Sequence, residues 1–332
     1  MNDSITDIPG ILVGHAQDRA AGTGCTVILC ELGTAAGVDV RGGSPGTRET
    51  DCLAPSSAIA APNAFYLCGG SAFGLAGATG VQKYLEERGI GFDAEVARVP
   101  IVSGAVIFDL NVAASDVRPD EAMGMTACRN ASREVAQGNV GAGTGATAGW
   151  AAGPARRMKV GLGTASRKTG DLVVGAIVVV NCLGDVVDPS TGEILAGTLN
   201  EAGDGFAGSE KLLTAQPMGI NAYSTHSTIG VIATNANLEK GLASRVAMMA
   251  HDGLARAIVP VHTSGEGDIV FSVCTGAVAA GVSVVGALAA EAMTQAILNA
   301  VIYAESAYGY PCYRELQARR KKPTEGASRP RN

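Results

Sequence analysis

Residues 224–235 place hydroxyl and imidazole side chains directly before a stretch rich in β-branched residues. Ile229, Val231 and Ile232 favour a strand, and the asparagines that follow favour a turn that ends it. A strand this apolar is buried, so it constrains the fold more than any other segment. Taken alone, the pattern is also typical of an ordinary serine- and threonine-rich loop that leads into a core strand.

A hydroxyl residue at the start of a buried strand has a particular chemical use. If the peptide bond before Ser227 is cut, this serine becomes an N-terminus, and its own α-amine lies within reach of its Oγ. A free α-amine has a pKa of about 7.7–8.0, so it can act as a general base near neutral pH without a histidine partner. The rest of the chain decides between this chemistry and an ordinary loop.

The composition is that of a globular protein with much closely packed backbone. Of the 332 residues, 47% are hydrophobic and 17% are charged, and the length allows one large domain or two ordinary ones. The net charge of −6 argues against nucleic acid as a partner. The one basic cluster, at 319–322, belongs to a C-terminal segment (306–332), where we expect a solvated, mobile tail.

The reactive side chains indicate a reducing compartment and no metal. The eight cysteines form no C-x-x-C pair and lie mostly in apolar runs, which favours buried free thiols. None of the four histidines pairs with another at metal-ligand spacing. The N-terminus lacks the basic and apolar regions of a signal peptide. We therefore expect a cytoplasmic protein without a metal.

Residues 269–290 carry no charge, and a membrane span is one interpretation of that length. Glycines and hydroxyl residues instead divide the run into a strand over 269–275 and a buried helix. The helix continues with Glu291, Gln295 and Asn299 at four-residue spacing, which is one polar stripe on a helix of a soluble protein. No membrane is expected as a partner.

The remaining elements occur in blocks, with a hairpin between 158–165 and 172–181. That order favours an α+β layered sandwich over a doubly wound parallel sheet. The other expected strands are 26–30, 35–40, 64–68 and 100–110, and the expected helices are the segment that ends near 88, 120–137 and 238–256. Residues 201–222 predict a helix followed by a surface loop.

Two glycine-rich segments resemble known motifs without matching them. Residues 69–74 resemble a nucleophile elbow, but Phe73 stands where that motif needs glycine, and the lysine of a phosphate loop is absent. Gly141, Gly143 and Ala146 fit a loosened dinucleotide fingerprint, yet no β-α-β unit surrounds them. We expect tight, glycine-packed turns and no cofactor.

Polar side chains stand at the ends of several apolar segments. Asn181 ends one strand, and Lys159 lies inside another, where a lysine is costly unless it is paired or functional. Glu266 and Asp268 are two residues apart in the loop 260–268, so both point to one side if the loop is extended. Strand-end hydrogen bonding also explains Asn181 and Asp268, and a snorkelling surface lysine on an edge strand also explains Lys159.

Several segments along the chain together give it a resemblance to a known family, which no single segment gives alone. The chain resembles the DmpA-type self-processing aminopeptidases (peptidase family S58), which include β-peptidyl aminopeptidases and nylon-oligomer (6-aminohexanoate oligomer) hydrolases. The matching segments are RGGSPGTRETD (41–51), GGSAFGLA (69–76), VPIVSGAVIFDL (99–110), NVGAGTGATAG (139–149), KVGLGTAS (159–166), VVVNCLGDVVDP (178–189), STIGVIATNA (227–236), AHDGLARAI (250–258) and GDIVF (267–271).

The resemblance implies a four-layer αββα sandwich of the N-terminal-nucleophile type, shared with the ornithine acetyltransferases. It implies a single domain over 1–305 that cleaves itself between His226 and Ser227. The two products, 1–226 and 227–332, are expected to stay together and to assemble into a homotetramer. The implied substrates are small peptides or other oligoamides, and no cofactor is implied.

The resemblance also assigns roles to the polar residues. Ser227 is the nucleophile, and Asn181 and Lys159 flank it as oxyanion-stabilising or orienting groups. Glu266 and Asp268 are the acidic pair that positions the nucleophile and its amine, and Lys159 could keep these carboxylates ionised.

The chain departs from the family pattern in two places. His226 stands where relatives commonly have Asn or Gly, and Ser227 stands where the nylon-oligomer branch often has Thr. If the register is shifted by one residue, Thr228 is the nucleophile. The competing functions are an acyltransferase related to the ornithine acetyltransferases and an uncleaved, non-catalytic scaffold. The choice among α-peptides, β-peptides, D-residue amides and nylon oligomers depends on the shape of the pocket.

Overall fold

The computed structural model describes residues 2–215 and 226–321. In these residues two five-stranded sheets stack face to face, in the orders β1-β2-β5-β8-β4 and β11-β12-β15-β17-β3. The first sheet consists of β1 (Ile11–Asp18), β2 (Thr23–Cys30), β4 (Thr47–Arg48), β5 (Ala64–Cys68) and β8 (Val102–Val106). The second consists of β3 (Ala35–Val40), β11 (Leu162–Thr169), β12 (Leu172–Asn181), β15 (Ser227–Ala236) and β17 (Ile269–Val278).

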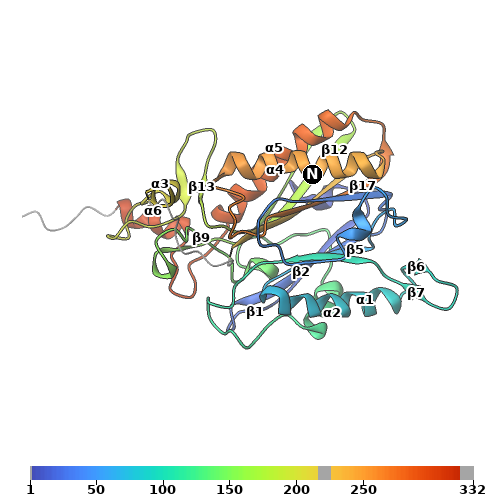
Figure 1. Ribbon diagram of the computed structural model, residues 1–332, viewed down its shortest axis with the longest axis horizontal. Helices are drawn as coiled ribbons and strands as arrows, with labels where there is room; N and C mark the ends of the chain where they lie inside the picture. Colours follow the sequence, from blue (N-terminus) through green and yellow to red (C-terminus); the bar gives the residue numbers. More distant parts are fainter. Residues whose placement is uncertain (1, 216–225, 322–332) are drawn as a thin grey trace, which may run out of the picture.

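Helices cover the outer face of each sheet (Figure 1). The first sheet is covered by α1 (Ala78–Glu86) and α2 (Glu121–Arg129), and the second by α4 (Lys240–Ala257) and α5 (Val282–Ile302). Between the sheets, Phe65 on β5 packs against Phe271 on β17 with ring centroids 5.1 Å apart. The expected αββα sandwich is confirmed.

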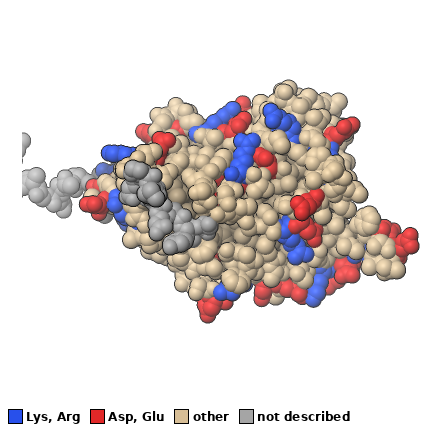
Figure 2. All heavy atoms as spheres, viewed as in Figure 1, with Lys and Arg blue, Asp and Glu red and all other residues tan. Residues whose placement is uncertain are grey.

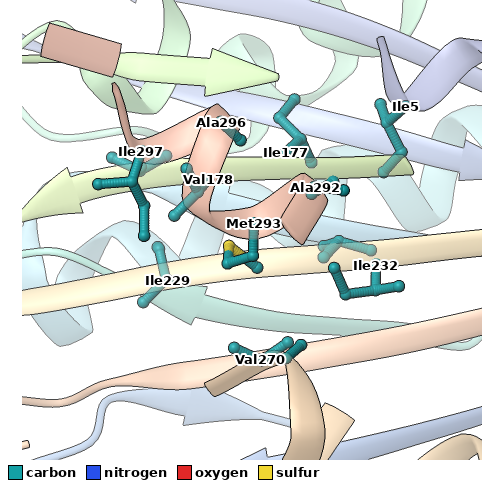
Figure 3. Packing of buried hydrophobic residues seen from close by; sticks show 14 of the residues in the cluster. Ile5, Ile177, Val178, Ile229, Ile232, Val270, Ala292, Met293, Ala296 and Ile297 are labelled. Atoms are coloured by element: carbon teal, nitrogen blue, oxygen red, sulfur yellow. The ribbon is translucent and has the colours of Figure 1, made fainter. Parts of the chain in front are cut away.

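The strand that begins at Ser227 lies in the middle of the second sheet. It pairs antiparallel with β12 and parallel with β17, and every residue of β12 and β15 is buried. Figure 3 shows side chains of these strands packed against Met293 and its neighbours on α5. A Cβ on Gly230 would lie 2.9 Å from Cε of Met293 and 3.0 Å from the carbonyl oxygen of Ile177, so glycine lets the helix approach the strand closely.

Helix α5 has the length and apolar composition of a membrane span, but 61% of its most apolar window is buried inside the protein. It packs against α4 and against β11 and β12 of the second sheet. This position as a core helix is the one expected from its polar stripe. On the face seen in Figure 2, charged side chains of both signs are scattered among uncharged ones.

Shorter elements gather at one end of the sandwich, on the left in Figure 1. There β13 (Asp185–Val187) pairs with β14 (Ile194–Ala196) and β16 (Ile258–Val259), and β9 (Thr147–Ala148) pairs with β10 (Met158–Lys159). Helices α3 (Ser209–Thr214) and α6 (Tyr313–Lys321) lie at the same end. The other short elements are β6 (Phe92–Asp93), β7 (Arg98–Val99) and the 3₁₀ turns η1 (Ile5–Asp7), η2 (Asp51–Leu53), η3 (Ser71–Gly77), η4 (Gly141–Gly143) and η5 (Pro154–Arg156).

Three expectations about these elements were wrong. The helix expected over 120–137 ends at Arg129, because Ser132 exchanges backbone hydrogen bonds of 3.0 Å with Val13 of β1. The strand expected over 158–165 is interrupted at Gly161, where a Cβ would lie 2.2 Å from the carbonyl oxygen of Gly138.

The third difference concerns the basic tail. Arg319 and Arg320 belong to α6, and they donate hydrogen bonds to the carbonyls of Gly203 and Asp204. The guanidinium of Arg320 also stacks over the ring of Phe206. These two residues are therefore held against the protein, whereas the last part of the expected tail, 322–332, lies outside the described residues.

Candidate active site

Ser227 is the first residue of β15, and it lies directly opposite Asn181, the last residue of β12. Both are buried, with 6% and 1% of their surfaces exposed. The antiparallel register of two apolar strands therefore brings a hydroxyl and an amide together at the strand ends. The sequence predicted both residues as site candidates, and the fold makes them neighbours.

The hydroxyl of Ser227 points back along its own chain. Its Oγ donates to the carbonyl oxygen of His226 at 2.6 Å, and the same oxygen accepts the N–H of Gly267 at 2.9 Å. A Cβ on Gly267 would lie 2.8 Å from Ser227 Oγ and 2.7 Å from the carbonyl oxygen of Ser44, so a larger residue would crowd the hydroxyl. The carbonyl before Ser227 thus accepts hydrogen bonds from both a hydroxyl and a backbone N–H.

The carboxylate of Asp268 binds the chain immediately after this serine. Its Oδ1 accepts the N–H of Thr228 at 2.7 Å, and its Oδ2 accepts the N–H of His262 at 3.1 Å. Nδ1 of His262 lies 2.8 Å from the same Oδ2. Asp268 is fully buried. It therefore orients the backbone beside Ser227, and His262 orients Asp268, a role that the sequence did not reveal.

Glu266 completes the acidic pair. Its Oε1 accepts the N–H of Leu183 at 3.1 Å, and its Oε2 accepts the N–H of Thr263 at 2.9 Å. Burial, and next the charge of Asp268, raise the pKa of Glu266 to about 7. A buried carboxyl of this kind can gain or lose a proton near neutral pH. The two acids lie close enough to influence each other, as their spacing predicted.

The amide of Asn181 is oriented by neighbours. Its Oδ1 accepts the backbone N–H of Thr147 at 3.1 Å, and its Nδ2 donates to the carbonyl of Phe108 at 3.3 Å. Because Thr147 holds the oxygen, the amide nitrogen faces away from β9. The side chain is therefore preorganised.

Lys159 is fully buried beneath the glycine-rich turn η4 and does not lie on an exposed edge. Its Nζ donates to the carbonyls of Gly143 at 3.1 Å and Ala146 at 3.0 Å, and also to that of Val160. Burial lowers the pKa of Lys159 to about 7, and the charge of Asp109 opposes this decrease. The carboxylate that acts on Lys159 is thus Asp109, and in the described residues no hydrogen bond joins Lys159 to the acidic pair.

The carboxylate of Asp109 explains why glycine stands at the start of the segment 69–74. Its Oδ1 accepts the N–H of Gly70 at 2.7 Å, and its Oδ2 accepts the hydroxyl of Thr23 at 2.8 Å. A Cβ on Gly69 would lie 1.9 Å from that Oδ2. The glycine at 69 therefore makes room for a buried carboxylate, in keeping with the tight turn expected there.

His226 lies against Trp150, whose ring also contacts the cationic Arg157. Its ring lies 4.9 Å from the Trp150 ring, at an interplanar angle of 53°. The Arg157 guanidinium stacks over Trp150 at 4.3 Å and over Tyr310 at 4.6 Å. Burial, and next the charge of Arg157, lower the pKa of His226 to about 3. His226 is therefore a neutral, flat side chain at this position.

The geometry distinguishes Ser227 from its neighbour Thr228. Successive side chains of a strand point to opposite faces, so only one of them faces the carbonyl of His226. Ser227 makes that contact, whereas Thr228 Oγ1 is buried without a hydrogen-bond partner in the described part of the chain. The arrangement supports Ser227 over the shifted register.

The family model for peptidase family S58 matches residues 3–312. An uncharacterized aminopeptidase of Mycobacterium tuberculosis is 43% identical over 345 residues, covering 95% of this chain and 98% of the relative. A 6-aminohexanoate-oligomer endohydrolase of Paenarthrobacter ureafaciens is 32% identical over 317 residues, covering 89% and 84%. Both similarities extend over most of each protein, so they concern the whole domain and not an isolated motif.

Solved structures show the same fold at lower identity. A β-aminopeptidase from Burkholderia sp. superposes with a TM-score of 0.68 at 22% identity, covering 96% of this chain and 93% of the other. An L-aminopeptidase D-Ala-esterase/amidase from Ochrobactrum anthropi, described as a variant of the Ntn hydrolase fold, gives 0.70 at 19% identity with the same coverage. The chain is therefore a member of peptidase family S58, an amide-bond hydrolase with an N-terminal-nucleophile fold.

Proposed function

We propose that this chain matures by cutting itself between His226 and Ser227 and then hydrolyses small linear amides with Ser227 as nucleophile. One observation carries the proposal: Ser227 Oγ lies 2.6 Å from the His226 carbonyl oxygen, which Gly267 N–H already binds at 2.9 Å. A nucleophile and an oxyanion donor thus meet at one peptide bond.

Self-cleavage would proceed as an acyl shift followed by hydrolysis. The Oγ of Ser227 bonds to the carbonyl carbon of His226, the hydroxyl proton passes to the peptide nitrogen, and the C–N bond breaks. Water then hydrolyses the resulting ester, which leaves a carboxylate on His226 and a free amine on Ser227. The products are 1–226 and 227–332, which we expect to remain associated because their strands β12 and β15 pair from Val174 opposite Thr234 to Asn181 opposite Ser227.

The same groups would serve the external substrate. The α-amine of Ser227 accepts the Oγ proton as the oxygen attacks the substrate carbonyl, and then donates it to the leaving amine. Gly267 N–H and the Asn181 amide stabilise the oxyanion, while Asp268 and Glu266 position the new N-terminus. Water releases the acyl group and regenerates the enzyme. Lys159 would act indirectly, by holding the glycine-rich turn whose carbonyl oxygens, those of Gly143 and Ala146, accept its hydrogen bonds.

The relatives suggest the substrate class, and the cysteines suggest the compartment. One relative is named an aminopeptidase and another a 6-aminohexanoate-oligomer endohydrolase, so we propose peptides, β-peptides or such oligomers as substrates. All eight cysteines lie in the described residues as free thiols, which fits a reducing cytoplasm. We further propose a homotetramer of processed pairs.

The experiment is a hydrolysis screen across α-peptide, β-peptide, D-residue and 6-aminohexanoate amides, with an added amine as acyl acceptor in parallel reactions. We expect release of the acyl group to water from at least one class, and its loss in Ser227→Ala. Transfer to the amine in place of hydrolysis would indicate the acyltransferase alternative. Equal activity of Ser227→Ala, or no activity with any class, would overturn the proposal.

A further inference from the structure

We propose that the pocket now filled by His226 is the subsite for the substrate residue on the acyl side of the cleaved bond, and that Trp150 makes it selective for an uncharged aromatic or imidazole side chain. This inference rests on the proposed function and adds the chemical class of the substrate to it. The observation behind it is the contact between the His226 and Trp150 rings, whose centroids lie 4.9 Å apart.

Self-cleavage and substrate cleavage impose the same geometry on the acyl group. In each case Ser227 Oγ bonds to a carbonyl carbon whose oxygen is held by Gly267 N–H. The attacking Oγ and the N–H that holds the oxygen are the same in both reactions, although the departing nitrogen is that of Ser227 in self-cleavage and that of the substrate in hydrolysis. We therefore place the acyl α-carbon of the substrate in the direction that His226 takes now. Once the cut end of the first fragment withdraws, a substrate residue can occupy this place.

Half-buried Trp150 forms one wall of this place, and buried Arg157 supports it. Arg157 is 2% exposed, and its guanidinium stacks over Trp150. The guanidinium donates to Asn111 Oδ1 and Thr147 Oγ1, both at 3.2 Å, and also to the hydroxyl of Tyr310. Since Thr147 also holds Asn181, the pocket and the nucleophile share one hydrogen-bonded support. Trp150 is therefore fixed relative to the reacting atoms.

The side chains of Trp150 and Arg157 determine which acyl residues of a substrate we expect to bind here. An indole ring favours another flat ring at centroid distances of 4.5–7 Å, the range in which His226 lies. The positive charge of Arg157 disfavours a second cation in the same buried space, and His226 itself stays neutral there. A small side chain would leave the indole face without a partner. Phenylalanine, tyrosine or neutral histidine on the acyl residue fits these walls, whereas lysine and glycine do not.

The first test compares aminoacyl p-nitroanilides that share one leaving group and differ in the acyl residue: Phe, Ala and Lys. In matured wild type we expect kcat/KM for Phe to exceed that for Ala by about tenfold, the size of one aromatic contact. Trp150→Ala should bring the ratio close to one, and Trp150→Phe should preserve most of it. Tyr303→Ala, which removes an aromatic side chain that is 53% exposed, is the matched control and should leave the ratio unchanged.

A second test needs no substrate and covers the case in which Trp150→Ala does not fold. Self-cleavage rates are compared for wild type, His226→Phe, His226→Gly and His226→Lys in otherwise intact chains. We expect Phe to support cleavage within about threefold of His, and Gly and Lys to slow it by about tenfold or more. Equal rates for all four would overturn the subsite.

The two proposals fail in different ways. Hydrolysis that depends on Ser227 but is as fast for Ala as for Phe, or a Phe/Ala ratio that Trp150→Ala leaves intact, overturns the subsite alone. A chain that hydrolyses none of the four amide classes overturns the proposed function, and the His226 series then still tests the pocket through self-cleavage.

Discussion

Buried Asp268 pairs with half-buried His262, and Oδ2 of the aspartate lies 2.8 Å from Nδ1 of the histidine. The other oxygen of Asp268 accepts the N–H of Thr228, next to Ser227. The histidine therefore binds the carboxylate oxygen that faces away from Thr228. We expect it to affect the site through the orientation of the carboxylate and not by contact with the substrate.

Asp268→Asn is expected to lower kcat by about 10²-fold or more in the processed protein, the scale of a positioned acid–base group. The amide cannot accept hydrogen bonds with both of its ends, so the backbone N–H of Thr228 or that of His262 loses its acceptor. Circular dichroism should show that the protein still folds. Near-normal turnover in the matured variant would remove Asp268 from the mechanism.

His262→Ala is expected to lower kcat by about tenfold with little change in KM, because one support of Asp268 is lost while the binding pocket is kept. His262 has a φ of +58°, a conformation that asparagine tolerates better than most residues. His262→Asn, which keeps a side-chain donor, should recover most of the loss. Equal losses for Ala and Asn, or an effect confined to KM, would show that His262 does not position Asp268.

Asn181→Ala is expected to reduce kcat by about 10²–10³, the usual contribution of one oxyanion donor, while KM stays close to that of wild type. Self-cleavage passes through an oxyanion too, so it should slow as well. Kinetics are therefore measured on the matured fraction only. A raised KM at unchanged kcat would make Asn181 a substrate-binding residue.

The stability of the fold should depend on pH through His15, a half-buried residue of β1. Burial lowers the pKa of His15 to about 4, below its usual value of about 6.5. Between these values the unfolded chain binds a proton that the folded chain does not, so stability present above pH 6.5 is lost as the pH falls towards 4. Urea unfolding in the uncleaved Ser227→Ala background should show a pH slope of up to about 1.4 kcal/mol per unit for this residue.

His15→Gln provides the comparison for that slope. The free energy of unfolding of this variant should fall less steeply, as the pH is lowered, than that of the parent protein. The reason is that the imidazole of His15, which takes up a proton on unfolding, is missing. Parallel slopes for the two proteins would mean that His15 titrates in the folded state as it does in the unfolded one.

The sequence predicts well the parts of the fold that depend on local pattern. The strands at 35–40, 64–68 and 172–181 have the observed bounds, because each is an apolar run closed by turn residues. The helix expected over 120–137 extends too far, since a pairing with β1, distant in sequence, ends it. The strand β1 itself was not expected, because its apolar residues alternate with polar ones only loosely.

The site is predictable to a similar degree. Residues with reactive side chains at strand ends, such as Ser227 and Asn181, stand out in the sequence, and the structure makes them neighbours. Gly267 and Trp150 do not stand out, because one contributes a backbone N–H and the other a ring face. Such roles depend on contacts between segments that are distant in the sequence, so local sequence patterns do not predict them. The partners of Lys159 could not be foreseen for the same reason.

Self-cleavage between His226 and Ser227 is the central claim, and the N-terminal sequence of the smaller fragment tests it most directly. Denaturing electrophoresis of the purified chain should separate fragments 1–226 and 227–332, and Edman degradation of the smaller one should read Ser-Thr-Ile-Gly. Ser227→Ala should remain a single chain of 332 residues. A fully active enzyme that stays intact, or a fragment that begins at Thr228, would contradict the account.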